Sequence, residues 1–185
     1  MTKAANTSDV IILGAGMIGL TQALTLAAHG LSVAIIDRAD SADLVNPGKD
    51  ARVSAINSAS WNMMEAIGLA DQLAPHGCDI DKILVNDGLK PGKLDFTPKD
   101  EEGPLGVMVE NAILRRVLFE AAQAHDAIAL HMSSQVAHCE RAEHHVDVTL
   151  EDGPILSAAL LIAADGRGSR MREEAGIIMA HWQYD

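Results

Sequence analysis

Apolar residues in the first 40 positions change their spacing twice along the chain. Residues 9–13 form a short apolar run that ends in glycine, which is typical of a fully buried strand. Residues 16–29 carry apolar side chains at helical spacing, and Gly30 follows where a helix often ends in a glycine with positive φ. Residues 31–36 form a second apolar run. The pattern predicts a strand, a helix and a second strand, with the two strands parallel.

The middle third of the chain is less regular. Residues 40–51 are polar and contain an Asn-Pro-Gly triplet, which predicts a loop, and residues 58–68 have the spacing of a short helix. Between residues 79 and 109, short β-like pieces alternate with proline, glycine and charge, which predicts an inserted antiparallel element. Residues 111–125 show the apolar face of a longer helix, with Asn111 in the position of its cap.

Strand patterns return in the last third. Residues 128–131 are a strand candidate, and residues 135–141 and 144–150 predict a hairpin. In the second arm of this hairpin, apolar residues alternate with polar ones, as in a half-exposed strand. Residues 160–164 again read as a buried strand.

These elements predict an α/β fold with a Rossmann-like parallel sheet, an added β-hairpin and part of an inserted antiparallel sheet. The chain has 185 residues, of which 48% are hydrophobic, and this suits one compact domain. We therefore interpret residues 1–185 as one domain and residues 79–109 as a partial insertion into it.

Charge and cysteine content narrow the function classes. The net charge of −12 would repel a phosphate backbone, so we expect no nucleic-acid partner. Two cysteines are too few for a disulfide framework, and the first residues are too polar for a signal peptide. No apolar stretch approaches the roughly 18 residues of a membrane span. The sequence thus indicates a cytoplasmic protein.

The first chemical motif is the glycine pattern Gly14, Gly16 and Gly19, which follows a predicted strand and opens a predicted helix. We expect Gly14 to allow the tight turn, Gly16 to admit a pyrophosphate, and Gly19 to let the helix pack closely. Asp37 follows at the end of the second strand, where it can accept hydrogen bonds from ribose hydroxyls. The context favours a dinucleotide site over a glycine-rich turn that binds nothing.

This motif alone does not separate FAD from NAD, because Asp37 suits either adenosine ribose. An NAD-dependent dehydrogenase therefore stays open as an alternative. NADP is disfavoured in this pocket, since its 2′-phosphate would lie beside a carboxylate.

The second motif comes after the strand at residues 160–164. Asp165 and Gly166 form a turn, Ser169 can cap a short helix, and Arg172 follows three residues later. Taken alone, this segment is most simply an ordinary Asp-Gly turn.

Together the motifs resemble the flavoprotein aromatic hydroxylases, which are class A flavoprotein monooxygenases, and among them the ubiquinone-biosynthesis hydroxylase branch. Asp165, Gly166, Ser169 and Arg172 match the spacing of the Asp-Gly motif of that family. Residues 50–57 are similar to its arginine segment, and Val109-Glu110-Asn111 is similar to a stretch of the ubiquinone branch. The resemblance spans Asp9 to Arg172.

The resemblance implies FAD as the cofactor and NAD(P)H as a transient reductant. The glycines would hold the pyrophosphate, Asp37 the adenosine ribose, and Arg52 the region of the pyrophosphate and ribityl chain. Asp165 and Gly166 would support the pyrophosphate and assist the reductant. Without the resemblance, Arg52 is most simply a solvated loop arginine. The full cofactor-binding set that we predict is Gly14, Ala15, Gly16, Ile18, Gly19, Asp37, Arg38, Arg52, Val136, Asp165 and Gly166.

The same resemblance implies a reaction class. The parent enzyme would use NAD(P)H and O2 to hydroxylate an aromatic small molecule, such as a polyprenylated phenol of ubiquinone biosynthesis. Such a substrate lies in a bilayer, so the parent enzyme would work as a peripheral protein at the inner face of the membrane or in a biosynthetic complex. The sequence identifies no catalytic residue.

The family also has a Gly-Asp motif beyond the Asp-Gly motif, and the sequence ends at Asp185 before reaching one. We therefore expect the chain to be the N-terminal, FAD-binding part of a longer architecture, with residues 79–109 as part of a substrate domain, and to be inactive alone. A non-catalytic nucleotide-binding fragment is a further alternative. His138, Cys139, His144 and His145 have no recognised ligand spacing, so we expect no metal.

Overall fold

The computed structural model describes residues 6–45, 50–86, 88, 92–98, 103–180 and 182–183. The chain divides into two compact units. The first unit combines Met1–Leu44 with Leu118–Asp185, and the second unit is Val45–Val117. The division falls within helix α5 (Asn111–Gln123). The assignment of residues 79–109 to a substrate domain stays a prediction.

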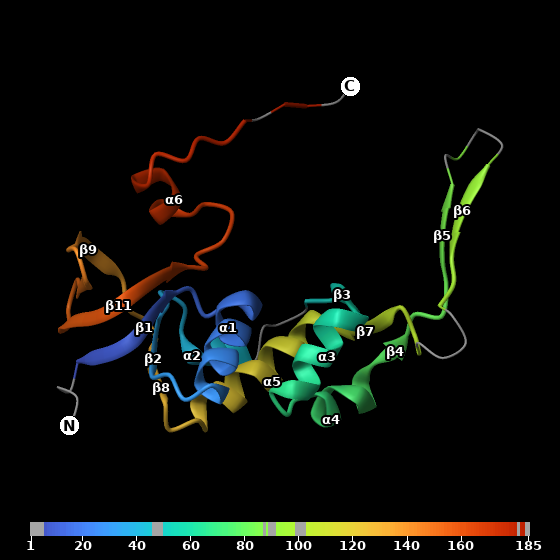
Figure 1. The fold of residues 1–185 in the computed structure, drawn as a ribbon, viewed down its shortest axis with the longest axis horizontal. Helices are drawn as coiled ribbons and strands as arrows, with labels where there is room; N and C mark the ends of the chain where they lie inside the picture. The colour runs from blue at the N-terminus through green and yellow to red at the C-terminus, as the bar shows by residue number, and fades with distance from the viewer. Residues whose placement is uncertain are drawn as a thin grey trace. The chain divides into compact units, whose positions relative to one another are not determined.

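Six strands form the sheet of the first unit. They are β1 (Thr7–Leu13), β2 (Val33–Ile36), β8 (Ile128–His131), β9 (Val136–Arg141), β10 (Val146–Leu150) and β11 (Ile155–Ala163). Their order across the sheet is β8-β2-β1-β11-β10-β9 (Figure 1). Strands β8, β2, β1 and β11 run parallel, β10 pairs antiparallel with β11, and β9 pairs antiparallel with β10. This sheet confirms the predicted α/β fold with a Rossmann-like parallel part and an added hairpin.

The centre of this unit is strand β1 with the helix that follows it. Ile11 and Ile12 are both fully buried although successive side chains point to opposite faces of a sheet, which explains the continuous apolar run. Helix α1 (Met17–Ala28) buries one face made of Gly19, Leu20, Ala23, Leu24 and Ala27. Gly30 follows the helix with φ +82°, as predicted.

In its described residues, the second unit contains two antiparallel sheets. Strands β3 (Val53–Asn57), β7 (Gly106–Glu110) and β4 (Cys78–Asp79) form one, in the order β3-β7-β4. Strands β5 (Ile83–Asn86) and β6 (Lys93–Phe96) form the other, a separate hairpin. Its described residues include the helices α3 (Ser58–Ala66) and α4 (Ala70–Leu73), a 3-10 turn at Ala74–His76, and the first part of α5. The antiparallel strands predicted between residues 79 and 109 are thus confirmed for the described residues.

Two local predictions were wrong, and one strand was missed. The predicted loop at 40–51 contains helix α2 (Ser41–Val45), which begins where Asp40 Oδ1 accepts a hydrogen bond from the Ala42 N–H at 2.8 Å, while residues 46–49 lie outside the described part. Strand β3 was not predicted, because its short polar-rich sequence becomes a strand only by pairing with β7. Strand β11 begins at Ile155 rather than at residue 160, because its first half pairs with β10.

The expected cap at Asn111 also differs from the structure. Asn111 is the first residue of α5, and its side-chain oxygen accepts a hydrogen bond from Ser54 Oγ at 2.6 Å. The amide therefore joins α5 to β3 across 57 residues of sequence, a long-range contact that local pattern does not reveal.

Candidate functional site

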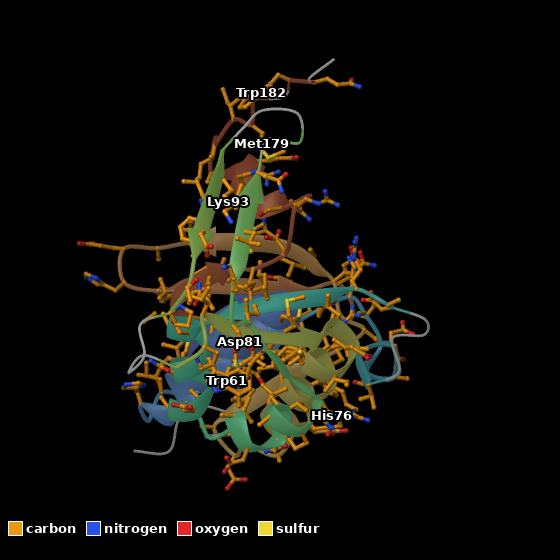
Figure 2. The ribbon with its side chains drawn as sticks, turned by 90° about the vertical axis from the view of Figure 1, so that its right-hand side faces the viewer. Trp61, His76, Asp81, Lys93, Met179 and Trp182 are labelled. Carbon is orange, nitrogen blue, oxygen red and sulfur yellow. The ribbon has the colours of Figure 1, made fainter. Side chains whose placement is uncertain are left out.

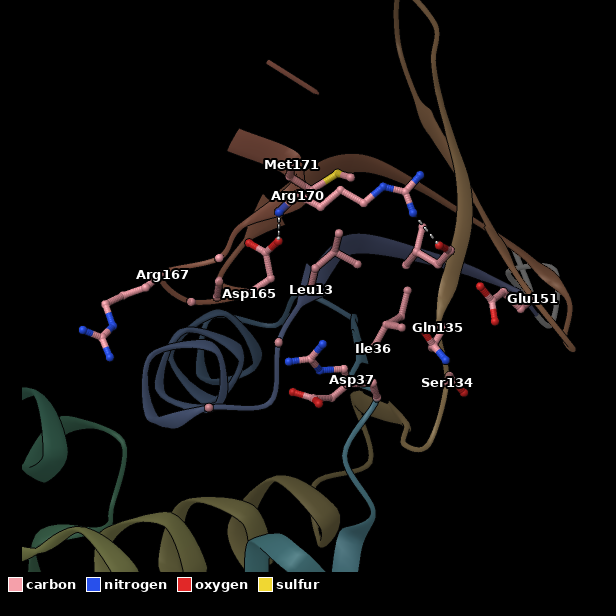
Figure 3. A pocket seen from close by; sticks show the side chains of 17 residues that line it. Leu13, Ile36, Asp37, Ser134, Gln135, Glu151, Asp165, Arg167, Arg170 and Met171 are labelled. Carbon is pink, nitrogen blue, oxygen red and sulfur yellow. Dashed lines mark hydrogen bonds between the residues drawn. The ribbon is translucent and has the colours of Figure 1, made fainter. Parts of the chain in front are cut away.

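A pocket of about 570 Å³ opens in the first unit, at the carboxyl ends of β1, β2 and β11. In the view of Figure 3, Asp165 and Arg167 lie at one end of it, Asp37 in the middle, and Ser134, Gln135 and Glu151 at the other end. The carboxyl edge of a parallel sheet is where nucleotide ligands bind in doubly wound folds. The lining residues are Leu13, Gly14, Gly16, Ile36, Asp37, Arg38, Ser134, Gln135, Val136, Glu151, Ala164, Asp165, Gly166, Arg167, Gly168, Arg170 and Met171.

The three glycines of the motif are not all required by the protein structure itself. Gly14 has φ +106°, and a Cβ there would collide with the carbonyl oxygen of Ala164. A Cβ on Gly19 would collide with the carbonyl oxygen of Gly14. Gly16 differs, because it has an ordinary φ of −72° and a Cβ there would meet nothing within 4 Å. Neither packing nor backbone conformation requires glycine at this position, so the open space beside Gly16 fits a ligand at the N-terminus of α1.

Asp37 lies at the end of β2, as predicted, and its carboxylate is already hydrogen-bonded. Oδ2 accepts from the Ala15 N–H at 2.6 Å, and Oδ1 accepts from the Ala39 N–H at 2.8 Å. The Ser134 N–H donates to the Asp37 carbonyl oxygen at 2.9 Å, which fixes its backbone as well. An ionised carboxylate can accept about four hydrogen bonds, so Asp37 retains capacity for ligand hydroxyls.

The Asp-Gly turn presents a second carboxylate to the same pocket. Asp165 Oδ2 accepts from the Arg170 N–H at 3.0 Å, whereas Oδ1 is buried without a partner among the described residues. Ser169 Oγ accepts from the Arg172 N–H at 3.1 Å and caps α6 (Arg170–Glu174), which confirms the predicted cap. A buried acceptor without a donor is costly, so Asp165 Oδ1 suits a ligand that donates a hydrogen bond.

Most of the predicted cofactor-binding residues meet at this pocket. Its lining includes the predicted positions Gly14, Gly16, Asp37, Arg38, Val136, Asp165 and Gly166. Ala15 and Gly19 are buried and are not among the lining residues, although they lie beside Gly14 and Gly16 in the turn and at the start of α1. Ile18 is outside the lining, with its side chain 78% exposed on α1.

Arg52 belongs to the second unit, where it forms a cluster with Asp50 and Arg115. Arg52 Nε and Nη2 each donate to the Asp50 carboxylate at 2.8 Å, and Arg115 Nη2 pairs with the same carboxylate. The hydrogen bond from Arg52 holds the pKa of Asp50 well below its usual range, and in turn Asp50 raises the pKa of Arg52. The Arg52 side chain is 75% exposed, so it can still meet a ligand.

Several lining residues were not predicted. Ser134 and Gln135 follow β8 at the same edge of the sheet as Asp37, and the strand pattern could have pointed to them. Arg167 directly follows the predicted Asp165-Gly166 turn, whereas Glu151 and Arg170 had no such signal in the sequence. Their position depends on how the β9–β10 hairpin and α6 fold back onto the parallel strands.

Other site classes find no support in the described part of the chain. No group of three His, Cys, Asp or Glu residues there could hold a metal ion. Burial raises the pKa of the Cys139 thiol, which opposes its use as a thiolate. The helices described are each too short or too polar to cross a bilayer.

A parallel sheet with a glycine turn, an open helix N-terminus and a carboxylate at the end of the second strand defines a dinucleotide-binding protein. The family comparison is more specific. Residues 7–183 match the FAD binding domain family, and the chain belongs to that family. Membership confirms the resemblance inferred from the motifs and supports FAD as the cofactor.

Two curated relatives share most of the chain. The ubiquinone hydroxylase UbiL of Rhodospirillum rubrum is 38% identical over 175 residues, which are 95% of this chain and 41% of the relative. The 3-demethoxyubiquinol 3-hydroxylase of Escherichia coli is 32% identical over 179 residues, which are 96% of this chain and 46% of the relative. The chain thus spans less than half the length of these relatives.

Solved structures agree in fold. PqsL, a probable FAD-dependent monooxygenase from Pseudomonas aeruginosa, matches with a TM-score of 0.78 at 23% identity, over 97% of this chain and 48% of that one. The flavin-dependent monooxygenase PieE, solved with FAD and substrate, matches with a TM-score of 0.70 at 22% identity, over 92% and 32%. At these identities the likeness shows the fold alone.

Proposed function

We propose that this chain is the FAD-binding part of an NAD(P)H-dependent flavoprotein monooxygenase that hydroxylates an aromatic ring. The observation that carries the proposal is the open space beside Gly16, in a pocket that Asp37 and Asp165 also line. The chain that forms this pocket belongs to the FAD binding domain family. Relatives named as a ubiquinone hydroxylase and a 3-demethoxyubiquinol 3-hydroxylase support ring hydroxylation as the reaction.

The pocket fits the ADP half of FAD along its length. The free N–H groups and partial positive charge at the start of α1 would hold the pyrophosphate beside Gly16. The Asp37 carboxylate would accept hydrogen bonds from the adenosine ribose in addition to those from the backbone. The adenine would then lie further along the wall, where Arg38 and Val136 line the pocket.

Asp165 and Gly166 would act on the other side of the pyrophosphate. Asp165 Oδ1 needs a donor, and a cofactor hydroxyl would supply one. Gly166 has φ +83°, which keeps the turn tight and leaves its backbone close to the ligand. Bound FAD would supply the redox chemistry of hydroxylation, with NAD(P)H as the reductant. The residues described here bind and orient the nucleotide, and none is assigned to the reacting ring.

Arg52, which belongs to the second unit, stays a predicted cofactor-binding residue. Its bidentate pairing with Asp50 fixes the plane of the guanidinium while most of the side chain stays exposed. Such a pre-oriented arginine suits a phosphate or a ribityl hydroxyl.

The substrate class follows from the relatives. We propose a polyprenylated phenol or quinol precursor of ubiquinone, and, because such a molecule lies in a bilayer, association of the longer enzyme with a membrane surface or a biosynthetic complex. An NAD-dependent dehydrogenase is the weaker candidate, since it does not account for the family match over residues 7–183.

The test is nucleotide binding by the purified chain. FAD and ADP should compete for one site, measured by flavin fluorescence, whereas FMN should not bind because it lacks the adenosine half. Gly16→Val should lower the affinity for both FAD and ADP by roughly a hundredfold, since the side chain would occupy the space of the pyrophosphate.

Gln22→Val is the matched control, because it places the same side chain elsewhere on α1, outside the pocket lining. Circular dichroism should show that both variants remain folded. Binding of FMN as tight as that of FAD, or full binding of FAD by Gly16→Val, would overturn the proposed site.

A further inference from the structure

Arg170, the first residue of α6, forms hydrogen bonds with three parts of the first unit. Its Nη1 and Nη2 donate to the carbonyl oxygens of Val136 at 3.1 Å and Ala137 at 3.4 Å, both on β9. Its Nε donates to Glu174 Oε1 at 2.7 Å, and its backbone N–H donates to Asp165 Oδ2 at 3.0 Å. Figure 3 shows the side chain reaching from the Asp165 turn to β9. One residue therefore links the two walls of the pocket.

Strand β9 has a particular need for such a partner. It lies at the edge of the described sheet, and its pairing with β10 is irregular. The register passes from the pair Thr149–His138 to the pair Leu150–Val136, so Ala137 has no opposite residue. A bulge of this kind disrupts the ladder locally and bends the strand. The carbonyls that Arg170 contacts are those of the bulge and of the residue before it.

The same geometry argues against a direct role in holding phosphate. Nε, Nη1 and Nη2 all have partners within the protein, and Glu174 compensates part of the positive charge. Val136 and Arg170 both line the pocket, as Asp37 does.

We infer that Arg170 is a positioning residue for the adenosine end of the pocket. Its guanidinium holds the bulged segment of β9 at a set distance from the Asp165 turn, and this fixes the place of Val136 against the adenine of the bound nucleotide. The inference rests on the proposed function, because it requires the adenosine of the cofactor to lie along β9. Pre-organisation of this kind raises affinity without a direct contact.

The experiment compares adenosine with ADP on the purified chain, by NMR titration of backbone amides. Arg170→Met keeps the aliphatic stem and removes the guanidinium. It should weaken adenosine and ADP by the same factor, about five- to tenfold, which corresponds to one or two partly exposed hydrogen bonds. Arg170→Lys should restore part of the loss, since an ammonium can still donate to one of the two carbonyls. In the ligand-free variants, the amide signals of Val136 and Ala137 should shift.

Arg141→Met is the matched control, because it makes the same substitution on β9 outside the lining of this pocket. It should bind both ligands as the unmodified chain does. A loss for ADP but not for adenosine would mean that Arg170 contacts phosphate, and unchanged affinity for both ligands would mean that it has no role. Either result overturns the inference. Failure of the proposed function would look different, because the unmodified chain would then not bind ADP. In that case the amide shifts at Val136 and Ala137 would still show whether the Arg170 guanidinium is hydrogen-bonded to β9.

Discussion

The turn after β1 and the β5–β6 hairpin are both short segments. Contacts within the protein account for most residue types in the turn, but not for the apolar residues of the hairpin. In the turn, Gly14 and Gly19 are required by contacts with the backbone, and Ala15 is fully buried. Gly16 alone has open space around it, and that space faces the pocket. The packing of the first unit therefore accounts for this segment and leaves one position for a ligand to explain.

In the hairpin, every residue of β5 and β6 is exposed. The register pairs Ile83 with Phe96 and Val85 with Leu94, so these four apolar side chains share one face. They are between 43% and 62% exposed. Figure 2 labels Lys93, which lies on the opposite face with Asp95.

A hairpin of two strands is at best marginally stable alone in water. Contacts among the described residues do not explain why this one carries four large apolar residues on one side. The same holds for two residues near the end of the chain. Ile178 is 92% exposed, and Trp182, labelled in Figure 2, is 71% exposed. The pocket at the ends of β1, β2 and β11 is therefore built by contacts within the first unit, whereas contacts among the described residues leave the apolar face of the hairpin unexplained.

The largest expected effect concerns Gly19. Gly19→Ala should lower the stability of the chain by about 3 kcal/mol, because the new Cβ would collide with the Gly14 carbonyl and α1 would have to move off β1. Gly16→Ala makes the same chemical change where the Cβ meets nothing, so it should leave stability nearly unchanged. Urea denaturation of both variants measures the difference. Equal losses of stability would mean that the helix is not packed tightly against the turn at Gly19.

The next effect concerns Asp37. Asp37→Ala should weaken FAD binding roughly tenfold to a hundredfold, since a lost hydrogen bond to a charged group costs about 1.5–3 kcal/mol. Stability should fall too, because the carboxylate also accepts from the Ala15 and Ala39 N–H groups. Asp43→Ala, on exposed α2 and outside the pocket lining, is the control. A dissociation constant for FAD that Asp37→Ala leaves unchanged would remove Asp37 from the ribose site.

The next prediction concerns Asp50 in the second unit, whose carboxylate pairs with Arg52 and Arg115. Because the folded pKa of Asp50 lies below its unfolded value of about 3.9, its charged form stabilises the fold above that pH, and this contribution is lost as the pH falls towards the folded pKa. The chain should therefore be more stable than Asp50→Asn at neutral pH, and the two should converge in acid. Urea midpoints across this pH range measure the convergence, and parallel curves would contradict the pairing with Arg52 and Arg115.

The sequence predicted most of this site for a physical reason. Buried strands and glycine turns are local patterns, and the pocket lies where two such turns meet at one edge of a parallel sheet. Strand β3 and the hydrogen bonds from Arg170 to β9 could not be predicted in this way. Both depend on partners more than 30 residues away, the first on β7 and the second on the bulge at Ala137.

The smallest expected effect tests the hairpin itself. Leu94→Ser and Phe96→Ser should change the stability of the purified chain by no more than about 0.5 kcal/mol, as is usual for exposed positions without special contacts. Val148→Ser, at a fully buried position of strand β10, makes a comparable apolar-to-polar change and should cost about 2–4 kcal/mol. Urea denaturation compares the three. A large loss for Leu94→Ser or Phe96→Ser would show that the apolar face is already covered within this chain, and the contrast between the two regions would then fail.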